Sequence, residues 1–159
     1  ELELVSLSKR ESILEKLLKD VKEDYDYIII DCPPAMGLLT LNALVPSDSV
    51  LVPLEAEFYA YKGIDRLISI IENVQFNFNP ELHIGGVFIT KCNSQRVLTE
   101  NIKSSVKKHF GDKLFDTSIR VNVALAEAPV TGQDIFNYAP SSNGAIDYAN
   151  LVDEILIKV

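Results

Sequence analysis

Short, continuous apolar runs alternate along the chain with stretches in which apolar residues recur every three or four positions. Runs of the first kind predict strands buried on both faces of a parallel sheet, and stretches of the second kind predict amphipathic helices. The expected strands cover residues 1–7, 27–32, 48–54, 83–91 and 113–119, and the expected helices residues 9–21, 37–45, 60–76, 98–110 and 143–159. This alternation predicts a doubly wound, mostly parallel α/β sheet in one domain over residues 1–159.

The first helix carries a start signal of its own. Ser8 and Glu11 have the spacing of a capping box, in which each side chain accepts a hydrogen bond from the backbone N–H of the other residue. We therefore expect this helix to begin at Ser8.

A carboxylate closes the first apolar run, in the stretch YIIIDCPP. In open parallel sheets ligands bind beyond the carboxyl ends of the strands, so Asp31 can hold Mg²⁺ or its water shell beside a phosphate. The alternative is an aspartate that caps the following turn, and the residues alone leave both readings open. Pro33 and Pro34 prevent further ladder pairing, and Gly37 permits a sharp turn into the next helix.

Residues 25–44 (YDYIIIDCPPAMGLLTLNAL) closely resemble the second Walker motif and switch region of the ParA/Soj partitioning ATPases. Residues 83–91, 106–119 and 125–155 resemble the same family in the same order. The resemblance implies that Asp31 acts on the Mg²⁺ shell and the γ-phosphate side of ATP. It also implies that residues 33–39, with Pro33, Pro34 and Gly37, form a phosphate-sensing switch.

The same resemblance implies partners and a location. Proteins of this family hydrolyse Mg-ATP, dimerise, bind DNA without sequence preference and act with a ParB-like partner. We therefore expect a cytoplasmic, nucleoid-associated protein that partitions chromosomes or plasmids. The two cysteines show no disulfide or metal-site spacing, which also favours a reducing compartment.

One part of the family pattern is missing from these 159 residues. They contain no G-x-x-x-x-G-K-[ST] motif, whose backbone N–H groups and lysine cradle the phosphates. We therefore expect a fold that is incomplete at its N-terminus, with ATP and Mg²⁺ not bound to this chain alone. Whether the chain itself is an enzyme stays open. The strand at 27–32 would lack a neighbour, so we expect self-association, by edge pairing or exchange of elements, or else a rearranged sheet.

Three residues at strand ends are candidates for a nucleotide base site. Lys91 and Asn93 follow the strand at 83–91 and resemble the T-K-x-D element of related GTPases, with Asn93 at the acidic position. Asn122 follows the strand at 113–119, where the family usually has an IPRN loop. Asn can offer a donor and an acceptor to a purine edge. The alternative is that these are ordinary loop residues.

Charge is unevenly distributed over the chain. The net charge is −8, which argues against general affinity for nucleic acid. From Lys91 to Arg120, however, the chain has seven basic and three acidic residues, a local charge of +4. The resemblance makes this segment a candidate surface for DNA phosphates, with Arg96, Lys103, Lys107, Lys108 and Arg120 as its residues. The alternative is a solvated helix face, because the usual family arginine falls on Gln95 here.

There are three alternative functions. A MinD-like ATPase would end in a basic membrane-binding helix, but the last helix here carries Asp147, Asp153 and Glu154 against Lys158 alone, so we expect no membrane partner. A receiver domain would need an acidic pair after its first strand, and residues 1–10 contain none in that arrangement. A degenerate interaction module without catalysis is the remaining alternative.

Overall fold

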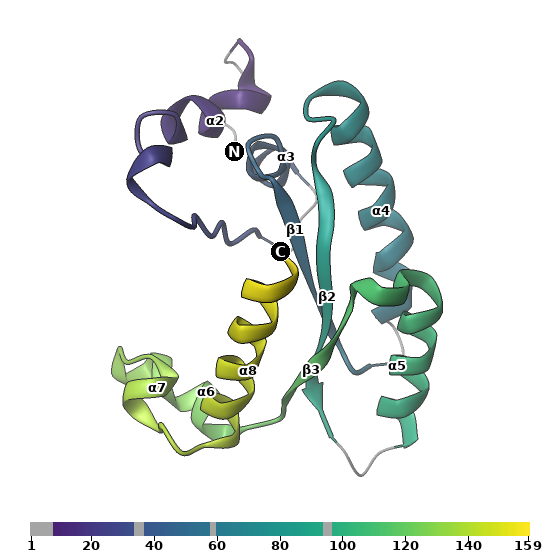
Figure 1. Cartoon of the computed structure of the whole chain (residues 1–159), viewed down its shortest axis with the longest axis vertical. Coiled ribbons are helices and arrows are strands. Elements are labelled where there is room, and N and C mark those ends of the chain that lie inside the picture. The colour runs from purple at the N-terminus through teal and green to yellow at the C-terminus, as the bar shows by residue number, and fades with distance from the viewer. Residues whose placement is uncertain (1–7, 34–36, 58–59, 94–96) are drawn as a thin grey trace. The chain divides into compact units, whose positions relative to one another are not determined.

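The computed structural model describes residues 8–33, 37–57, 60–93 and 97–159 (Figure 1). The chain divides into two compact units. The first comprises Glu1–Val50 with Asp65–His83, and the second comprises Leu51–Ile64 with Ile84–Val159. Each unit is described by itself. The expectation of one domain over residues 1–159 stays a prediction.

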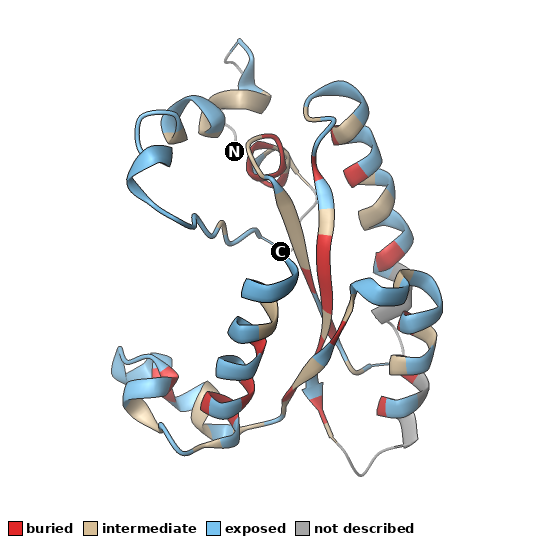
Figure 2. Cartoon of the chain, in the orientation of Figure 1, coloured by how far each residue is buried: buried red, intermediate tan, exposed pale blue. Residues whose placement is uncertain are grey.

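A parallel sheet organises the second unit. Its strands are β1 (Ser49–Glu55), β2 (His83–Cys92) and β3 (Leu114–Arg120), hydrogen-bonded in the order β1-β2-β3. Most of the centre of β2 is buried, as Figure 2 shows, and Val87 and Ile89 are fully covered. The predicted parallel α/β fold is confirmed, and so are the strands predicted at residues 48–54, 83–91 and 113–119. The strand predicted at residues 1–7 lies outside the described residues.

Helices account for most of the remaining chain. The longer ones are α3 (Leu38–Leu44), α4 (Ala60–Asn77), α5 (Val97–Phe110) and α8 (Asn143–Lys158). The short ones are η1 (Arg10–Ser12), α2 (Ile13–Leu18), η2 (Lys22–Asp24), η3 (Gly111–Lys113), α6 (Val123–Glu127), η4 (Ala128–Thr131) and α7 (Ile135–Tyr138). Both α5 and α8 pack against β3, and Figure 1 shows them on opposite sides of that strand.

The core beneath α8 joins helix and sheet. Phe115, Ile119 and Leu151 form a buried cluster, and Phe88 packs against it. Gly86 of β2 makes room for this cluster, because a Cβ atom there would lie 2.2 Å from the ring of Phe115. A side chain at position 86 would therefore displace the ring that anchors α8 to the sheet.

Two carboxylates of α8 hold the backbone of β3. Glu154 accepts hydrogen bonds from the N–H groups of Asp116 at 2.8 Å and Thr117 at 2.9 Å, and from Lys158 Nζ at 2.7 Å. Asp147 accepts from the N–H of Arg120 at 2.9 Å. Unpaired N–H groups on a strand edge are costly to bury and invite pairing with another chain. The two carboxylates therefore stabilise β3 where the described sheet ends.

A distant asparagine caps the first helix of the first unit. Asn42 of α3 is buried, and its Oδ1 accepts from the N–H groups of Ile13 at 3.0 Å and Leu14 at 3.2 Å. Its Nδ2 donates to the carbonyl of Arg10 at 2.7 Å. The predicted capping box of Ser8 and Glu11 is wrong, because neither η1 nor α2 has a local side-chain cap. The orphan N–H groups are satisfied through tertiary packing instead.

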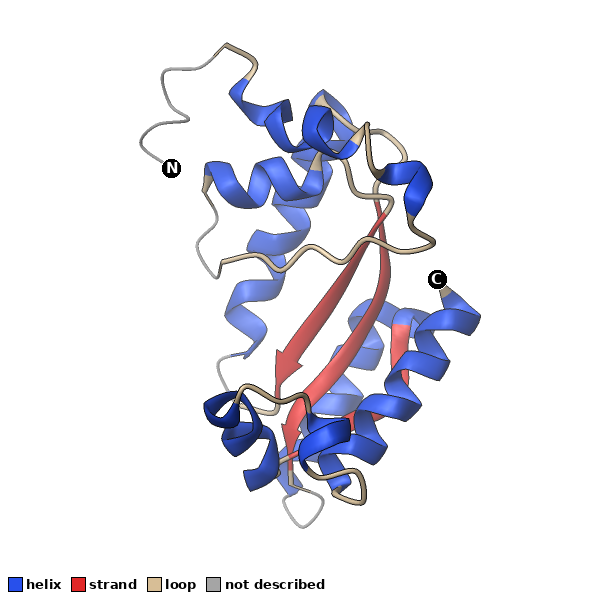
Figure 3. Cartoon of the chain, turned by 90° about the vertical axis from the view of Figure 1, so that its left-hand side faces the viewer, coloured by secondary structure: helices blue, strands red, loops and turns tan. Residues whose placement is uncertain are grey.

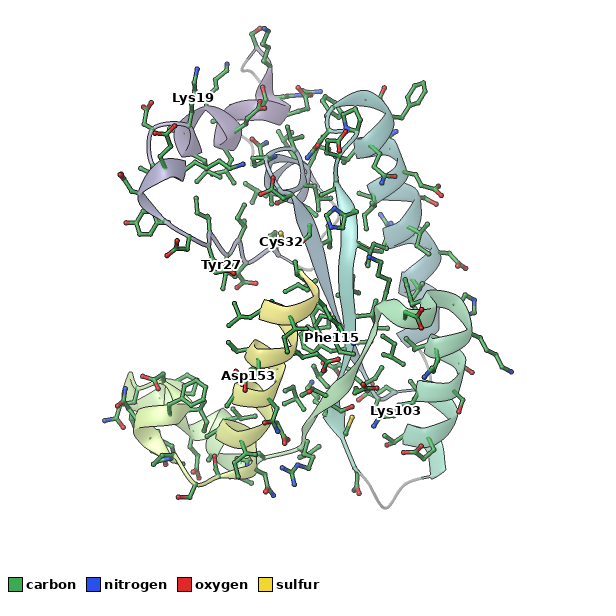
Figure 4. The ribbon with its side chains drawn as sticks, in the orientation of Figure 1. Lys19, Tyr27, Cys32, Lys103, Phe115 and Asp153 are labelled. Carbon is green, nitrogen blue, oxygen red and sulfur yellow. The ribbon has the colours of Figure 1, made fainter. Side chains whose placement is uncertain are left out.

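The apolar run that ends at Cys32 does not form a strand, contrary to the prediction. Residues 27–33 are irregular and largely exposed, with Ile29 94% exposed, and Figure 3 shows them as a loop. Figure 4 labels Tyr27 and Cys32 near the two ends of this segment. No described residue forms a backbone hydrogen bond with this segment. A strand needs a neighbour to pair with, and the described chain does not supply one.

We expect Glu154→Gln to lower the free energy of unfolding by about 1–2 kcal/mol near neutral pH, because one charge-assisted acceptor is lost. Burial raises the pKa of Glu154, but hydrogen bonds from Lys158 and the β3 N–H groups outweigh it and lower the pKa from 4.5 to about 2. This stability is fully present above pH 4.5 and is lost as the pH falls towards 2. Urea titrations of both proteins across this range measure the difference.

The matched control is Asp153→Asn, which removes the same charge from an exposed neighbour on α8 (Figure 4). It should leave stability nearly unchanged. A Glu154→Gln protein that matches the wild type at neutral pH would contradict the role of this carboxylate.

Candidate functional site

The carboxyl ends of β2 and β3 lie side by side. Cys92 pairs with Arg120 in the parallel register, and the N–H of Val121 donates to the carbonyl of Cys92 at 3.0 Å. Asn93 directly follows Cys92, and Asn122 lies two residues after Arg120. The structure therefore brings two of the three predicted base-site residues to one edge of the sheet, where parallel sheets bind ligands.

Asn122 presents an unsatisfied acceptor at this edge. Its Oδ1 is buried and has no hydrogen-bond partner among the described residues. The residue occupies the N-cap position of α6, but its side chain does not cap that helix. A buried acceptor without a donor costs about 1–3 kcal/mol. The position thus suits a ligand that brings an N–H donor, such as an amino group on a heterocycle.

The backbone of Asn93 is fixed from the neighbouring helix. Its carbonyl accepts a hydrogen bond from the hydroxyl of Thr99, which is buried on α5, at 3.0 Å. This contact joins the end of β2 to α5. The edge of the sheet is therefore anchored on one side by α5 and on the other by the β3 ladder.

Lys91 is held at the end of β2 by an acidic partner. Its Nζ lies 2.5 Å from Glu55 Oε1 on β1, and its backbone adopts φ 52°, a left-handed conformation that is uncommon outside glycine. The hydrogen bond and charge of Glu55 raise the pKa of Lys91. The ammonium group is thus oriented towards β1, and the predicted base role of Lys91 stays a prediction.

Arg120 is engaged by α8 and does not project freely from the surface. Its guanidinium contacts Asp147 at 2.6–3.1 Å, and the Asp147 side chain is only 8% exposed. Burial raises the pKa of Asp147, but the hydrogen bonds from Arg120 outweigh it and lower the pKa below its usual value. Removing the Arg120 side chain would leave the buried carboxylate of Asp147 without its cation. The expected contact of Arg120 with DNA remains untested, and its observed role is to bind α8.

The three lysines of α5 do not all lie on one face. Lys107 and Lys108 are exposed, whereas Lys103 (labelled in Figure 4) is half-buried. Lys103 lines a pocket of about 350 Å³ together with Glu100, Asp116 and Ser118. Lys103 and Lys107 are one helical turn apart, but Lys108 is rotated by about 100° from Lys107. Arg96 lies outside the described residues.

Asp31 belongs to the first unit and follows the unpaired apolar segment. It is exposed, and no described residue forms an ion pair with it. Pro33 is exposed too, and Pro34 lies outside the described residues. Gly37 is the N-cap of α3 with φ −113°, which any residue can adopt, so the expected special freedom of glycine is not used there.

Residues 8–33, 37–57, 60–93 and 97–159 hold no group of three or more His, Cys, Asp or Glu side chains arranged around a possible metal ion. None of the helices in these ranges combines the length and the apolar character that crossing a bilayer requires.

Comparison with known proteins identifies the class. A family model described as an AAA domain matches residues 1–84. The sporulation initiation inhibitor protein Soj of Bacillus subtilis is 45% identical over 155 residues, which is 98% of this chain and 61% of that protein. The chromosome-partitioning ATPase Soj of Treponema pallidum is 41% identical over 98% of this chain and 62% of its own length.

A solved structure agrees with these matches. Cobyrinic acid a,c-diamide synthase from Mycobacterium smegmatis, bound to an ATP analogue and magnesium, superposes with a TM-score of 0.80 at 29% identity. The match covers 98% of this chain and 57% of that chain. Sheet, helices and matches together define an α/β fold of the P-loop NTPase type. The chain belongs to the ParA/Soj-like family of partitioning ATPases.

The chain spans about three fifths of the length of the Soj proteins that it matches. Sequence reasoning found the strand-end residues of the candidate site but missed Asp147, which positions Arg120 from 27 residues away. An aspartate in the middle of an amphipathic helix gives no local signal of such a role.

Proposed function

We propose that the chain is part of a Mg²⁺-dependent ATPase that partitions chromosomes or plasmids, and that it supplies the base-binding edge, a metal-side carboxylate and a DNA-binding helix. The observation that best supports the base site is the buried, unpartnered Oδ1 of Asn122 beside the end of β2. An adenine amino group is a donor that this oxygen could accept from. Asn93, one strand away, adds a second amide of the same kind.

Asp31 is the residue we propose on the metal side of the nucleotide. Carboxylate oxygens are ligands or outer-shell partners that Mg²⁺ prefers, and the Asp31 side chain is exposed without an ion-pair partner among the described residues. When bound, Mg²⁺ would neutralise phosphate charge and stabilise the leaving oxygens. The role of Asp31 is to hold the metal or its water on one side, with Pro33, Pro34 and Gly37 in the switch that follows.

The phosphate cradle is not encoded in these 159 residues, which contain no G-x-x-x-x-G-K-[ST] motif. Triphosphate carries most of the charge of ATP, and a carboxylate alone repels it. The chain by itself should therefore bind Mg-ATP weakly and not turn it over. Whole-protein activity, dimerisation, a ParB-like partner and association with the nucleoid are proposed for the complete protein.

DNA binding is proposed for the exposed side of α5. Lys107 and Lys108 are exposed near its C-terminal end, and Lys103 lies one turn earlier. Clustered lysines contact phosphates without reading bases. Dimerisation would double the number of these contacts. If ATP drives dimerisation, DNA affinity would therefore depend on the bound nucleotide.

In the complete protein, we expect Asp31→Ala to abolish Mg²⁺-dependent ATP turnover while leaving the circular dichroism spectrum unchanged. The matched control is Asp26→Ala, which removes an exposed carboxylate from the same stretch of chain. Phosphate release at saturating Mg-ATP measures both. Turnover at the wild-type rate in the Asp31→Ala protein would refute the metal-side assignment.

For the base site, Asn122→Ala should weaken ATP binding by about tenfold, because one hydrogen bond to the base is lost. Binding of inorganic tripolyphosphate, which has no base, should not change. Isothermal titration calorimetry of the complete protein with both ligands separates the two effects. An equal loss for tripolyphosphate would show that Asn122 supports the fold and does not bind the base.

For the DNA surface, replacing Lys103, Lys107 and Lys108 with Glu should reduce the affinity of the ATP-bound complete protein at least tenfold, equally for unrelated duplexes. Wild-type affinity should fall steeply with salt. The matched control places Glu at Lys9, Lys16 and Lys19, which are exposed in the first unit. Fluorescence anisotropy with labelled duplexes measures the binding. Equal losses in both triple variants would indicate a general charge effect and no DNA site on α5.

A further inference from the structure

A groove in the first unit is not used by the proposed ATPase function. It has a volume of about 690 Å³ and lies among η1, the start of α3 and the middle of α4. All of its lining residues belong to the first unit. This volume is within the range of protein sites that bind small molecules or short peptide segments.

The floor of the groove is apolar. Leu38 and Leu41 lie one turn apart on α3, and Ile70 faces them from α4. All three side chains are only partly buried within the chain. Two helices that present apolar side chains along a shared groove form the kind of surface that receives one face of an amphipathic helix.

The wall formed by α4 is polar and carries a cation. Arg66, Ser69 and Asn73 line the groove at helical spacing on the same face as Ile70. No described carboxylate forms an ion pair with Arg66, although the chain as a whole has a net charge of −8. At the other end of the groove, Arg10 Nε lies 3.0 Å from Glu11 Oε1, so that pair is largely neutral. The groove thus offers one uncompensated guanidinium beside an apolar floor.

We propose that this groove is a docking site for a short acidic amphipathic segment of a partner protein. Its apolar face would cover Leu38, Leu41 and Ile70, and a carboxylate beside that face would pair with Arg66 in the planar, bidentate geometry that guanidinium favours. The hydroxyl of Ser69 and the amide of Asn73 would add polar contacts along the rim. This site requires neither nucleotide nor Asp31, so it goes beyond the proposed function and is tested separately from it.

Charge complementarity favours this occupant over nucleic acid. A nucleic acid would place phosphates near Arg66 and also near Glu11, and it would leave the leucine floor without an apolar partner. A basic segment would leave Arg66 facing a like charge. An acidic segment with an apolar face would pair with Arg66 and also cover the apolar floor.

The test uses the chain itself and two fluorescein-labelled synthetic peptides. In the first, leucines recur at helical spacing and glutamates flank them, and in the second each glutamate is replaced by lysine. Fluorescence anisotropy should show binding of the glutamate peptide and at least tenfold weaker binding of the lysine peptide. Equal affinities, or no binding of the glutamate peptide, would overturn the proposal.

Variants then locate the peptide on the chain. Arg66→Glu and Ser69→Glu should each weaken binding of the glutamate peptide about tenfold, because each adds a negative charge to the groove. Lys16→Glu is the matched control, an exposed charge reversal on α2 outside the groove. Arg66→Gln, which keeps a polar side chain, separates loss of the cation from loss of fold, and it should also weaken binding. Wild-type affinity in Arg66→Glu and Arg66→Gln would overturn the assignment.

A labelled single-stranded oligonucleotide provides the last comparison. It should not compete with the glutamate peptide for the chain. Direct binding of the oligonucleotide to the chain that is lost in Arg66→Glu would identify the groove as a nucleic-acid site and overturn the peptide proposal.

Discussion

Parallel pairing of β2 and β3 is the interaction on which the rest of the second unit depends. It places Cys92 opposite Arg120, and thereby brings Asn93 and Asn122 to one edge of the sheet. It also presents the backbone of β3 to α8, whose Asp147 and Glu154 accept hydrogen bonds from it. A shift of register by one residue would turn Phe115 and Ile119 to the other face and break the core with Leu151.

The first unit shows what happens when such pairing is missing. Residues 27–31 have the composition of a buried strand, yet Tyr27 is 66% and Ile29 94% exposed. β-branched residues favour an extended backbone, but a ladder needs N–H and C=O groups on an adjacent strand. Asp31 is therefore held by no ladder in the described chain.

The parts of the fold that local patterns determine were predictable from the sequence. Apolar periodicity predicted β1, β2 and β3 and the long helices, and resemblance to family loops selected Asn93 and Asn122 as candidates. The missed features depend on residues far apart in sequence. Asn42 caps residues 28 and 29 positions earlier, and Glu154 binds backbone groups 37 and 38 positions earlier. No local pattern of side chains records such contacts.

The charged residues also show this difference between what local sequence predicts and what tertiary packing decides. The local excess of basic residues is visible in the sequence, but the use of each charge is decided by packing. Arg120 forms an ion pair with Asp147, and Lys91 forms one with Glu55. Lys103 lines a pocket with Glu100 and Asp116. Lys107 and Lys108 are left exposed, so the surface available to an anionic polymer is smaller than the sequence suggests.

Hydrogen exchange of the chain, read residue by residue by NMR, tests the central claim about strand pairing most directly. We expect slow exchange at the amides of β2 and at Asp116, Thr117 and Arg120 of β3, which ladder bonds or α8 carboxylates protect. We expect fast exchange at Ile28, Ile29 and Ile30, which have no backbone partner in the described structure. Equal protection of these three amides and of β2 would show that strand pairing does not distinguish the two segments.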